Sequence, residues 1–123
     1  MMKSRDTLIR LKRFQAEEKR RRVKQIEAMV AEFTRMAGEL DREIANEEKR
    51  AGITDPHHFA YPTYARAAST RRDNLKRSID ELGGQIEEAK AGLEEALTEL
   101  TKYESLEGRE KAMERAHEAA ARA

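Results

Sequence analysis

The sequence predicts an all-α protein in which two long helices form an antiparallel coiled-coil hairpin. Three observations support this fold class. Charged residues make up 40% of the 123 residues and aromatic residues only 5%, a composition too polar for an ordinary globular core of this size. Apolar residues recur along most of the chain at alternating gaps of three and four, as in a heptad repeat. A single segment that contains a glycine and both prolines interrupts this pattern.

The first helix is expected over residues 3–51, which contain no proline. Its apolar positions form one seam and comprise Val23, Ile26, Val30, Phe33, Ala37, Leu40 and Ile44. Upstream of this stretch the repeat is expected to lose its register across residues 17–22, which are mostly charged. In this region the seam should therefore be frayed or shifted in register.

The tip of the hairpin is expected over residues 52–62. Gly52 is placed to end the first helix in the left-handed conformation that glycine tolerates. Asp55 followed by Pro56 is typical of a residue that opens a short turn. Three of the six aromatic residues lie in or next to this segment. We expect at least one of Phe59 and Tyr64 to plug the end of the seam, whereas aromatic side chains exposed at the tip would be candidate binding anchors.

The second helix is expected over residues 63–120. Its seam comprises Ala68, Leu75, Ile79, Leu82, Ile86, Ala89, Leu93, Ala96, Leu100 and Tyr103. Beyond Tyr103 the register is expected to skip to Leu106 and Met113. Gly83 and Gly84 lie inside this helix, where each glycine costs about 1 kcal/mol relative to alanine.

Residues 1–123 are expected to form one hairpin domain, because a short connection favours antiparallel neighbours. Residues whose numbers add to roughly 114 should then lie side by side, so Ile44 is expected near Ala68 and Leu11 near Tyr103. The charges agree with this pairing. The first 24 residues are rich in lysine and arginine, and residues 80–110 are rich in glutamate, so the pairing brings opposite charges together.

Composition and motifs argue against several classes of function. No cysteine is present for a disulfide or a thiolate metal site, and no apolar run approaches the length of a membrane span. His57 and His58 are adjacent and therefore point in different directions, so we expect no metal, no cofactor and no catalytic site. The basic residues 19–22 are interpreted first as a solvated helix face, second as a contact for an acidic protein, and only third as a nucleic-acid contact.

The opening residues 3–14, the basic residues 18–22 and the tip residues 55–65 together resemble the FliJ family of flagellar export proteins, in its alphaproteobacterial form. The resemblance implies a coiled-coil component of the flagellar type III protein export apparatus, which serves motility and chemotaxis. Such a protein is cytoplasmic and peripheral to the flagellar basal body at the inner membrane.

The resemblance also implies partners. They are the hexameric export ATPase FliI, which a family member enters as a central-stalk-like element, the cytoplasmic domain of the export gate protein FlhA, and export chaperones. Nucleic acid and direct membrane insertion are not expected. By position, the ATPase-binding residues are Arg5, Leu8, Ile9, Leu11, Lys12, Phe14, Leu106, Arg109 and Met113, and the gate-binding residues are Phe59, Tyr61 and Tyr64. A structural homodimeric coiled coil is the alternative, and a basic nucleic-acid tether is a third interpretation.

Overall fold

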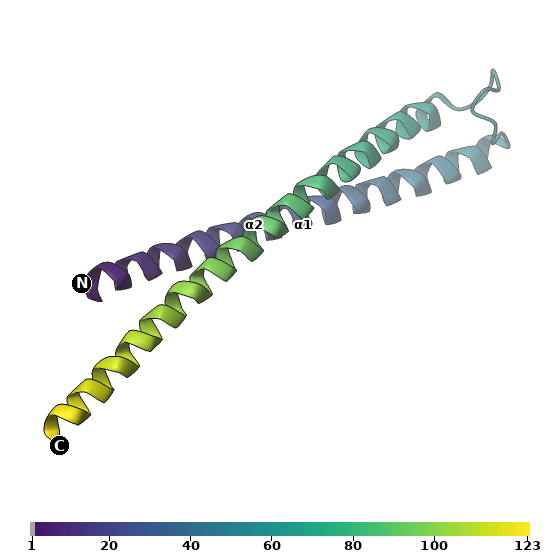
Figure 1. Ribbon diagram of the computed structural model, residues 1–123. Coiled ribbons are helices and arrows are strands. Elements are labelled where there is room, and N and C mark those ends of the chain that lie inside the picture. The colour runs from purple at the N-terminus through teal and green to yellow at the C-terminus, as the bar shows by residue number, and fades with distance from the viewer. Residues whose placement is uncertain (1) are drawn as a thin grey trace. The chain divides into compact units, whose positions relative to one another are not determined.

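The computed structural model describes residues 2–123, and the side chains of residues 4–123, as two long helices (Figure 1). α1 spans Met2–Ala51 and α2 spans Thr63–Arg122. The sequence places these helices over residues 3–51 and 63–120. The described residues contain no strand. The prediction of an all-α fold with two long helices packed against each other is therefore confirmed.

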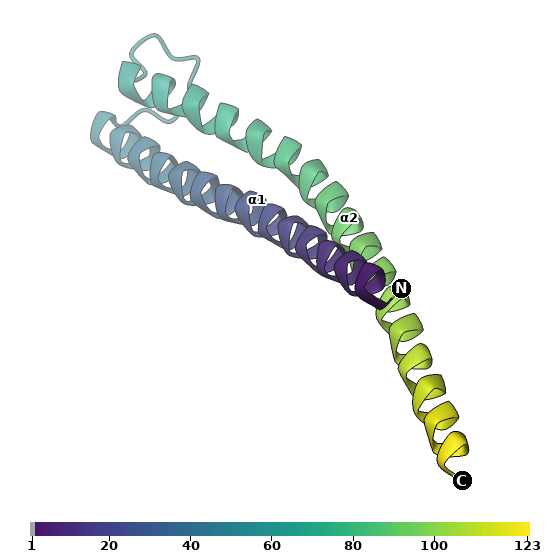
Figure 2. The same ribbon diagram turned by 90° about the vertical axis from the view of Figure 1, so that its left-hand side faces the viewer.

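The chain divides into two compact units, and each contains a segment of both helices (Figure 2). The terminal unit consists of the described residues up to Val23 together with Glu88–Ala123, and the tip unit is Lys24–Glu87. In the terminal unit, Arg5 pairs with Glu110 and Lys12 pairs with Glu99. Partners of later α1 residues thus lie earlier in α2, so the two segments are antiparallel.

The tip unit has a compact apolar core. It is formed by Leu40, Ile44, Tyr61, Ala65 and Ala68, with Ile53 and Leu75 packed against it. The predicted proximity of Ile44 to Ala68 is confirmed. Burying a side chain such as isoleucine stabilises a fold by about 1.5–3 kcal/mol, so this cluster holds the end of the seam together.

The seam of α1 keeps one register through both units. Buried residues recur every seven positions at Ile9, Ala16 and Val23, and we label these positions a. In the terminal unit the d positions carry Arg5, Lys12 and Lys19. In the tip unit they carry Ile26 and further apolar residues. The prediction that the repeat loses its register across residues 17–22 is wrong. Basic side chains occupy seam positions there, because their alkyl stems can cover apolar surface while the charge reaches out.

The seam of α2 also continues further than the sequence predicts. After Leu100 and Tyr103 its a and d positions are Glu107 and Glu110, and both are partly buried. The predicted skip of register at Tyr103 is therefore wrong. Met113 is 71% exposed and takes no part in the seam.

The tip contains a glycine in a left-handed conformation, and it also contains a buried tyrosine. Gly52 has a φ of 71°, and its N–H donates to the Glu48 carbonyl at 2.9 Å, as the sequence predicts for a helix end. Tyr61 is 5% exposed and its hydroxyl donates to the Glu48 carboxylate at 2.9 Å. Phe59 is 95% exposed, so it does not plug the seam. Tyr61 fills that place, because the turn before Pro62 directs it inward.

Among the described residues, neither helix contains a stretch apolar enough to cross a bilayer.

Candidate partner-binding surface

The heptad register divides the surface of the terminal unit into two sides. When two antiparallel helices pair through their a and d positions, the c and g positions of both helices lie on one side of the seam. The b and e positions lie on the other. We call these the c/g side and the b/e side. The two sides differ in chemistry.

Ion pairs cover much of the b/e side. Arg13 donates to Glu104 at 2.9 Å across the helices, and Arg20 lies 3.5 Å from Glu17 along α1. The hydrogen bond to Glu104 raises the pKa of Arg13, and the charge of that glutamate adds to the effect. Each exposed pair contributes at most about 1 kcal/mol, so these pairs select the register more than they stabilise it.

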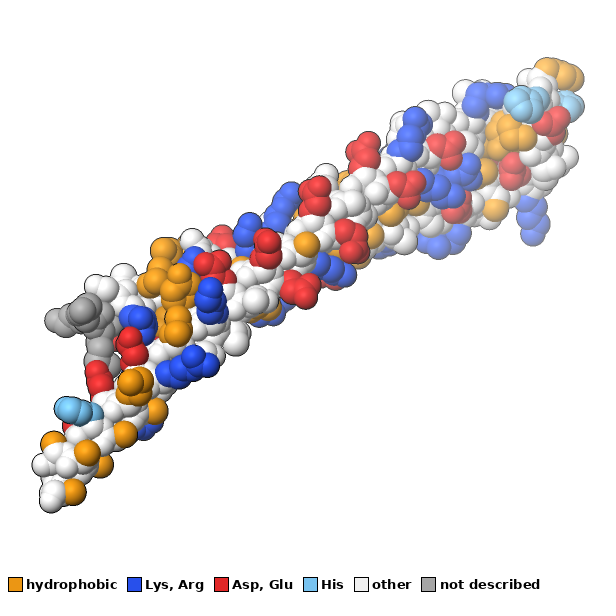
Figure 3. Space-filling model, viewed as in Figure 1, with side chains coloured by type: hydrophobic (Ala, Val, Ile, Leu, Met, Phe, Trp, Pro, Cys, Tyr) orange, Lys and Arg blue, Asp and Glu red, His pale blue; other side chains and the backbone are white. Residues whose placement is uncertain are grey.

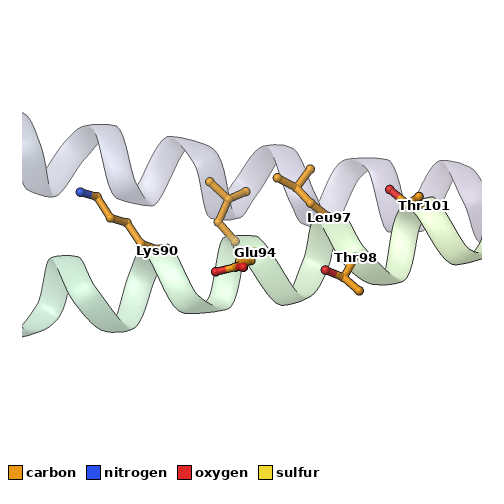
Figure 4. Close-up of a pocket in the computed structure, with 6 residues that line it drawn as sticks. Lys90, Glu94, Leu97, Thr98 and Thr101 are labelled. Carbon is orange, nitrogen blue, oxygen red and sulfur yellow. The ribbon is translucent and has the colours of Figure 1, made fainter.

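A shallow groove of about 410 Å³ also opens on this side (Figure 4). Its lining comes entirely from α2 and comprises Lys90, Leu93, Glu94, Leu97, Thr98 and Thr101. Leu97 points toward α1, whereas Thr98 lies on the outer face. The groove has no convergent set of titratable groups, so it is an ordinary shallow depression along α2.

The c/g side carries exposed apolar residues instead. Leu8 and Leu106 occupy g positions and are partly buried, whereas Leu11 at a c position is 49% exposed. Met113, at a g position, is 71% exposed, and Phe14, one turn beyond Leu11 on the outer face, is 60% exposed. We call these five residues the terminal patch. Space-filling representation shows hydrophobic side chains gathered near the start of α1 with basic side chains beside them (Figure 3).

Around Leu106 and Met113, the charges at the c and g positions of α2 are positive. At the c and g positions of residues 102–113, Lys102 and Arg109 accompany the two apolar residues, and no acid is present. The α1 positions opposite, among residues 4–11, carry a serine and two leucines. Neither Lys102 nor Arg109 forms an ion pair with any described residue. Aromatic, methionine and arginine side chains are enriched at protein interfaces, which this surface resembles in composition.

The structure separates the nine predicted ATPase-binding residues into two groups. Leu8, Leu11, Phe14, Leu106 and Met113 form the terminal patch, and Arg109 lies beside it. The other three belong to the seam: Ile9 is only 3% exposed, Arg5 pairs with Glu110, and Lys12 pairs with Glu99. The burial of Ile9 corrects its interpretation as a surface for a partner, whereas Arg5 and Lys12 are partly exposed and form ion pairs within the hairpin.

Lys102 is a residue of this surface that the sequence interpretation missed. Lys102 lies one heptad before Arg109, at the same c position. This relation can be recognised in the sequence only when the heptad register is continued past Tyr103. A second missed feature is a groove lined in part by Gly92, a g position on the same side, and by Lys19. A Cβ atom at Gly92 would lie 3.9 Å from both Cδ and Nζ of Lys19.

The tip presents one exposed aromatic side chain on a well-ordered turn. The Asp55 carboxylate accepts from the N–H of His57 at 2.9 Å, and the His58 ring nitrogen Nδ1 accepts from the N–H of Ala60 at 3.0 Å. The Phe59 ring stacks on His58 with centroids 4.7 Å apart. Of the predicted gate-binding residues, Phe59 is thus available to a partner.

The other two predicted gate-binding residues are engaged within the chain. Tyr61 is buried, as described above, and this corrects its interpretation as an exposed anchor. Tyr64 is 52% exposed and donates from its hydroxyl to Glu43 at 2.8 Å. That hydrogen bond is the main cause that raises the pKa of Tyr64.

The part of the chain that the structure describes contains no group of three or more histidine, aspartate or glutamate side chains arranged to hold a metal ion. Comparisons with protein families, with curated proteins and with solved structures give no match to this chain. The surfaces themselves are therefore the physical basis on which a function can be proposed.

Proposed function

We propose that this protein is an adaptor of the flagellar type III export apparatus, which binds the hexameric export ATPase through its terminal unit. The proposal rests on the resemblance of residues 3–14 and 55–65 to the FliJ family. The observation that supports it most is the terminal patch, where Leu11 is 49% exposed and Phe14 is 60% exposed. Exposed apolar side chains of this size in one unit of a polar chain are typical of a binding surface.

The proposal includes a central-stalk-like role at the ATPase ring, and a cytoplasmic location next to the flagellar basal body. It also includes contacts with the export gate and with export chaperones. Phe59 is the candidate anchor for the gate protein, because it is 95% exposed on a hydrogen-bonded turn. A large aromatic ring that is held rigidly loses little conformational entropy when it enters a pocket.

Mixing the full chain with purified export ATPase tests the main contact. We expect a complex on gel filtration and a changed rate of ATP hydrolysis. Leu11→Glu should abolish both, because it places a charge within the apolar contact. Thr98→Glu, on the exposed outer face of α2, is the matched control and should leave both unchanged. If wild-type protein neither forms a complex nor alters hydrolysis, the proposed function is wrong.

The gate contact is tested in a separate binding experiment. Phe59→Ser should weaken binding of the full chain to the isolated cytoplasmic domain of the gate protein, whereas His57→Ser on the same turn should not. Light scattering of the free protein provides the remaining check. A stable dimer that forms no complex with either partner would favour the homodimeric coiled coil instead.

A further inference from the structure

Two consecutive turns at the tip have the same hydrogen-bond pattern. In the first turn, the N–H of His58 donates to the Asp55 carbonyl at 3.1 Å, and the Asp55 carboxylate accepts from the N–H of His57 at 2.9 Å. In the second turn, the N–H of Tyr61 donates to the His58 carbonyl at 3.0 Å, and Nδ1 of His58 accepts from the N–H of Ala60, also at 3.0 Å. In each turn the first side chain thus accepts from the N–H of the third residue.

The second turn also supports the exposed phenyl ring of Phe59. Phe59 lies at the second position of this turn, and its ring stacks on the His58 ring with an angle of 22° between the planes. The hydrogen bond to Ala60 fixes the orientation of the His58 ring, on which the phenyl ring rests. Histidine and hydrophobic side chains lie together at the outer end of the tip unit (Figure 3). His58 is therefore placed to position Phe59.

The acceptors of the two turns respond differently to acid. The carboxyl group of Asp55 keeps an oxygen that can accept a hydrogen bond whether or not it is ionised. The imidazole of His58 accepts through Nδ1 only while it is neutral with its proton on Nε2, because both ring nitrogens are donors after protonation. Histidine side chains change charge between about pH 5 and 8. Acidification in this range would remove the acceptor of the second turn and leave that of the first.

Other charged and titratable groups also belong to these turns or bond to them. They are Asp55, His57, Tyr61, Glu48 and Arg66. Glu48 accepts from the Tyr61 hydroxyl at 2.9 Å, and Arg66 donates to a backbone carbonyl of the first turn at 2.9 Å. Among these five, only His57 is of a type that changes charge between about pH 5 and 8, so it needs a control of its own.

We propose that His58 is a positioning residue for Phe59, whose neutral ring holds the phenyl ring in place for a protein partner and whose protonation releases it. The inference rests on the gate contact of the proposed function and adds its regulation, since binding through Phe59 should weaken as the pH falls. A protonated ring would still attract a phenyl ring, so stacking alone does not give this dependence. The lost acceptor does, because a mobile anchor loses more conformational entropy on binding.

NMR of the full chain tests this mechanism without a partner. The ring nitrogens of His58 should show the proton on Nε2 at about pH 8, and the Ala60 amide should shift with the same midpoint as the His58 ring. His58→Asn should remove this shift, because the asparagine oxygen accepts from the same N–H and does not titrate. His57→Asn is the matched control and should leave the shift of Ala60 in place.

Binding to the isolated cytoplasmic domain of the gate protein tests the consequence. We expect the wild type to bind about two- to tenfold more weakly at about pH 5.5 than at about pH 8, which is the range that one hydrogen bond provides. The gate domain has titratable groups of its own, so the variants are compared at each pH. At the lower pH, His58→Asn should bind more tightly than the wild type, whereas His57→Asn should bind like the wild type.

A proton on Nδ1 of neutral His58, or an Ala60 shift that persists in His58→Asn, overturns the inference. The same ratio of wild-type to His58→Asn affinity at both pH values also overturns it, because a merely structural role would not change with pH. The outcome is separable from that of the proposed function. If the gate domain binds through Phe59 equally at both pH values, the gate contact stands and the positioning role fails. If the gate domain does not bind at any pH, the gate contact is wrong, and the NMR titration decides whether His58 holds the turn.

Discussion

The ammonium of Lys12 lies 3.1 Å from the carboxylate of Glu99, at a seam position that is apolar in the tip unit. The same ammonium lies 5.6 Å from the centre of the Tyr103 ring. Its side chain is 20% exposed, so the charge is partly removed from water and needs both partners. Lys12 therefore fixes the pairing of the helices where an apolar side chain would tolerate more than one register.

Reversing this charge should destabilise the terminal unit. Lys12→Glu places two carboxylates side by side, and we expect the free energy of unfolding to fall by about 1 kcal/mol or more. Adding Glu99→Lys to that variant restores an opposite pair and should recover part of the loss. Urea unfolding followed by circular dichroism measures both. Strictly additive effects of the two substitutions would show that the pair does not interact.

Filling the glycines within α2 should stabilise the protein. A Cβ atom at Gly83 or Gly84 meets no neighbouring atom within 4 Å, so alanine gains helix propensity without a clash. We expect about 1 kcal/mol of stabilisation from each substitution, measured by thermal unfolding.

Gly52→Ala, by contrast, should destabilise the protein. At Gly52 the φ of 71° is strained for any residue with a Cβ atom, although the space around it is open. We expect a loss of about 1 kcal/mol there. A neutral result at Gly52 would mean that the left-handed helix end relaxes when the glycine is removed.

Truncating the seam should show how strongly burial controls stability. Ile26 is 1% exposed, whereas Met29, one turn away, is 42% exposed. Ile26→Ala should lower the free energy of unfolding by about 2–5 kcal/mol through lost burial and a residual cavity. Met29→Ala should change it by less than about 1 kcal/mol. Similar losses from both substitutions would argue that Met29 is buried in a larger assembly.

Tyr61 should make the protein sensitive to alkaline pH. Burial raises the pKa of Tyr61 and the hydrogen bond to Glu48 adds to this, so the folded state holds the phenol proton more tightly than the unfolded state. The stability that this provides is complete below the ordinary tyrosine pKa of about 10 and is lost as pH rises through the higher folded value.

Tyr61→Phe removes this dependence together with the hydrogen bond. The wild type should be more stable than the variant at about pH 8, and the difference should shrink toward about pH 11. Urea unfolding at several pH values measures it. A difference that stays constant across this range would show that Tyr61 does not titrate differently on folding.

The heptad pattern was sufficient to predict the fold, because residues such as Val23, Ile26 and Ile44 repeat in a single register along α1. It was not sufficient near the termini. A search for apolar residues passes over Lys12 and Lys19, although both stand at d positions and an alkyl stem can cover apolar surface there. Once the register is known, Ile9 moves from the candidate surface into the seam and Lys102 joins the surface. At the tip, composition alone did not distinguish Phe59 from Tyr61, since the local hydrogen bonds decide which ring points inward.

The pairing of Glu48 with Tyr61 closes a segment of 13 residues, whereas that of Lys12 with Glu99 closes one of 87. Closing the longer segment from an open chain costs about 2 kcal/mol more in loop entropy. Nucleation is therefore expected at the tip, followed by zipping toward the termini. Pulse-labelled hydrogen exchange during refolding should protect the amides near Ile44 before those near Ile9, and simultaneous protection would contradict this order. During synthesis, the start of α1 then waits without its native partner until the ribosome has added Glu99 and the residues that follow it.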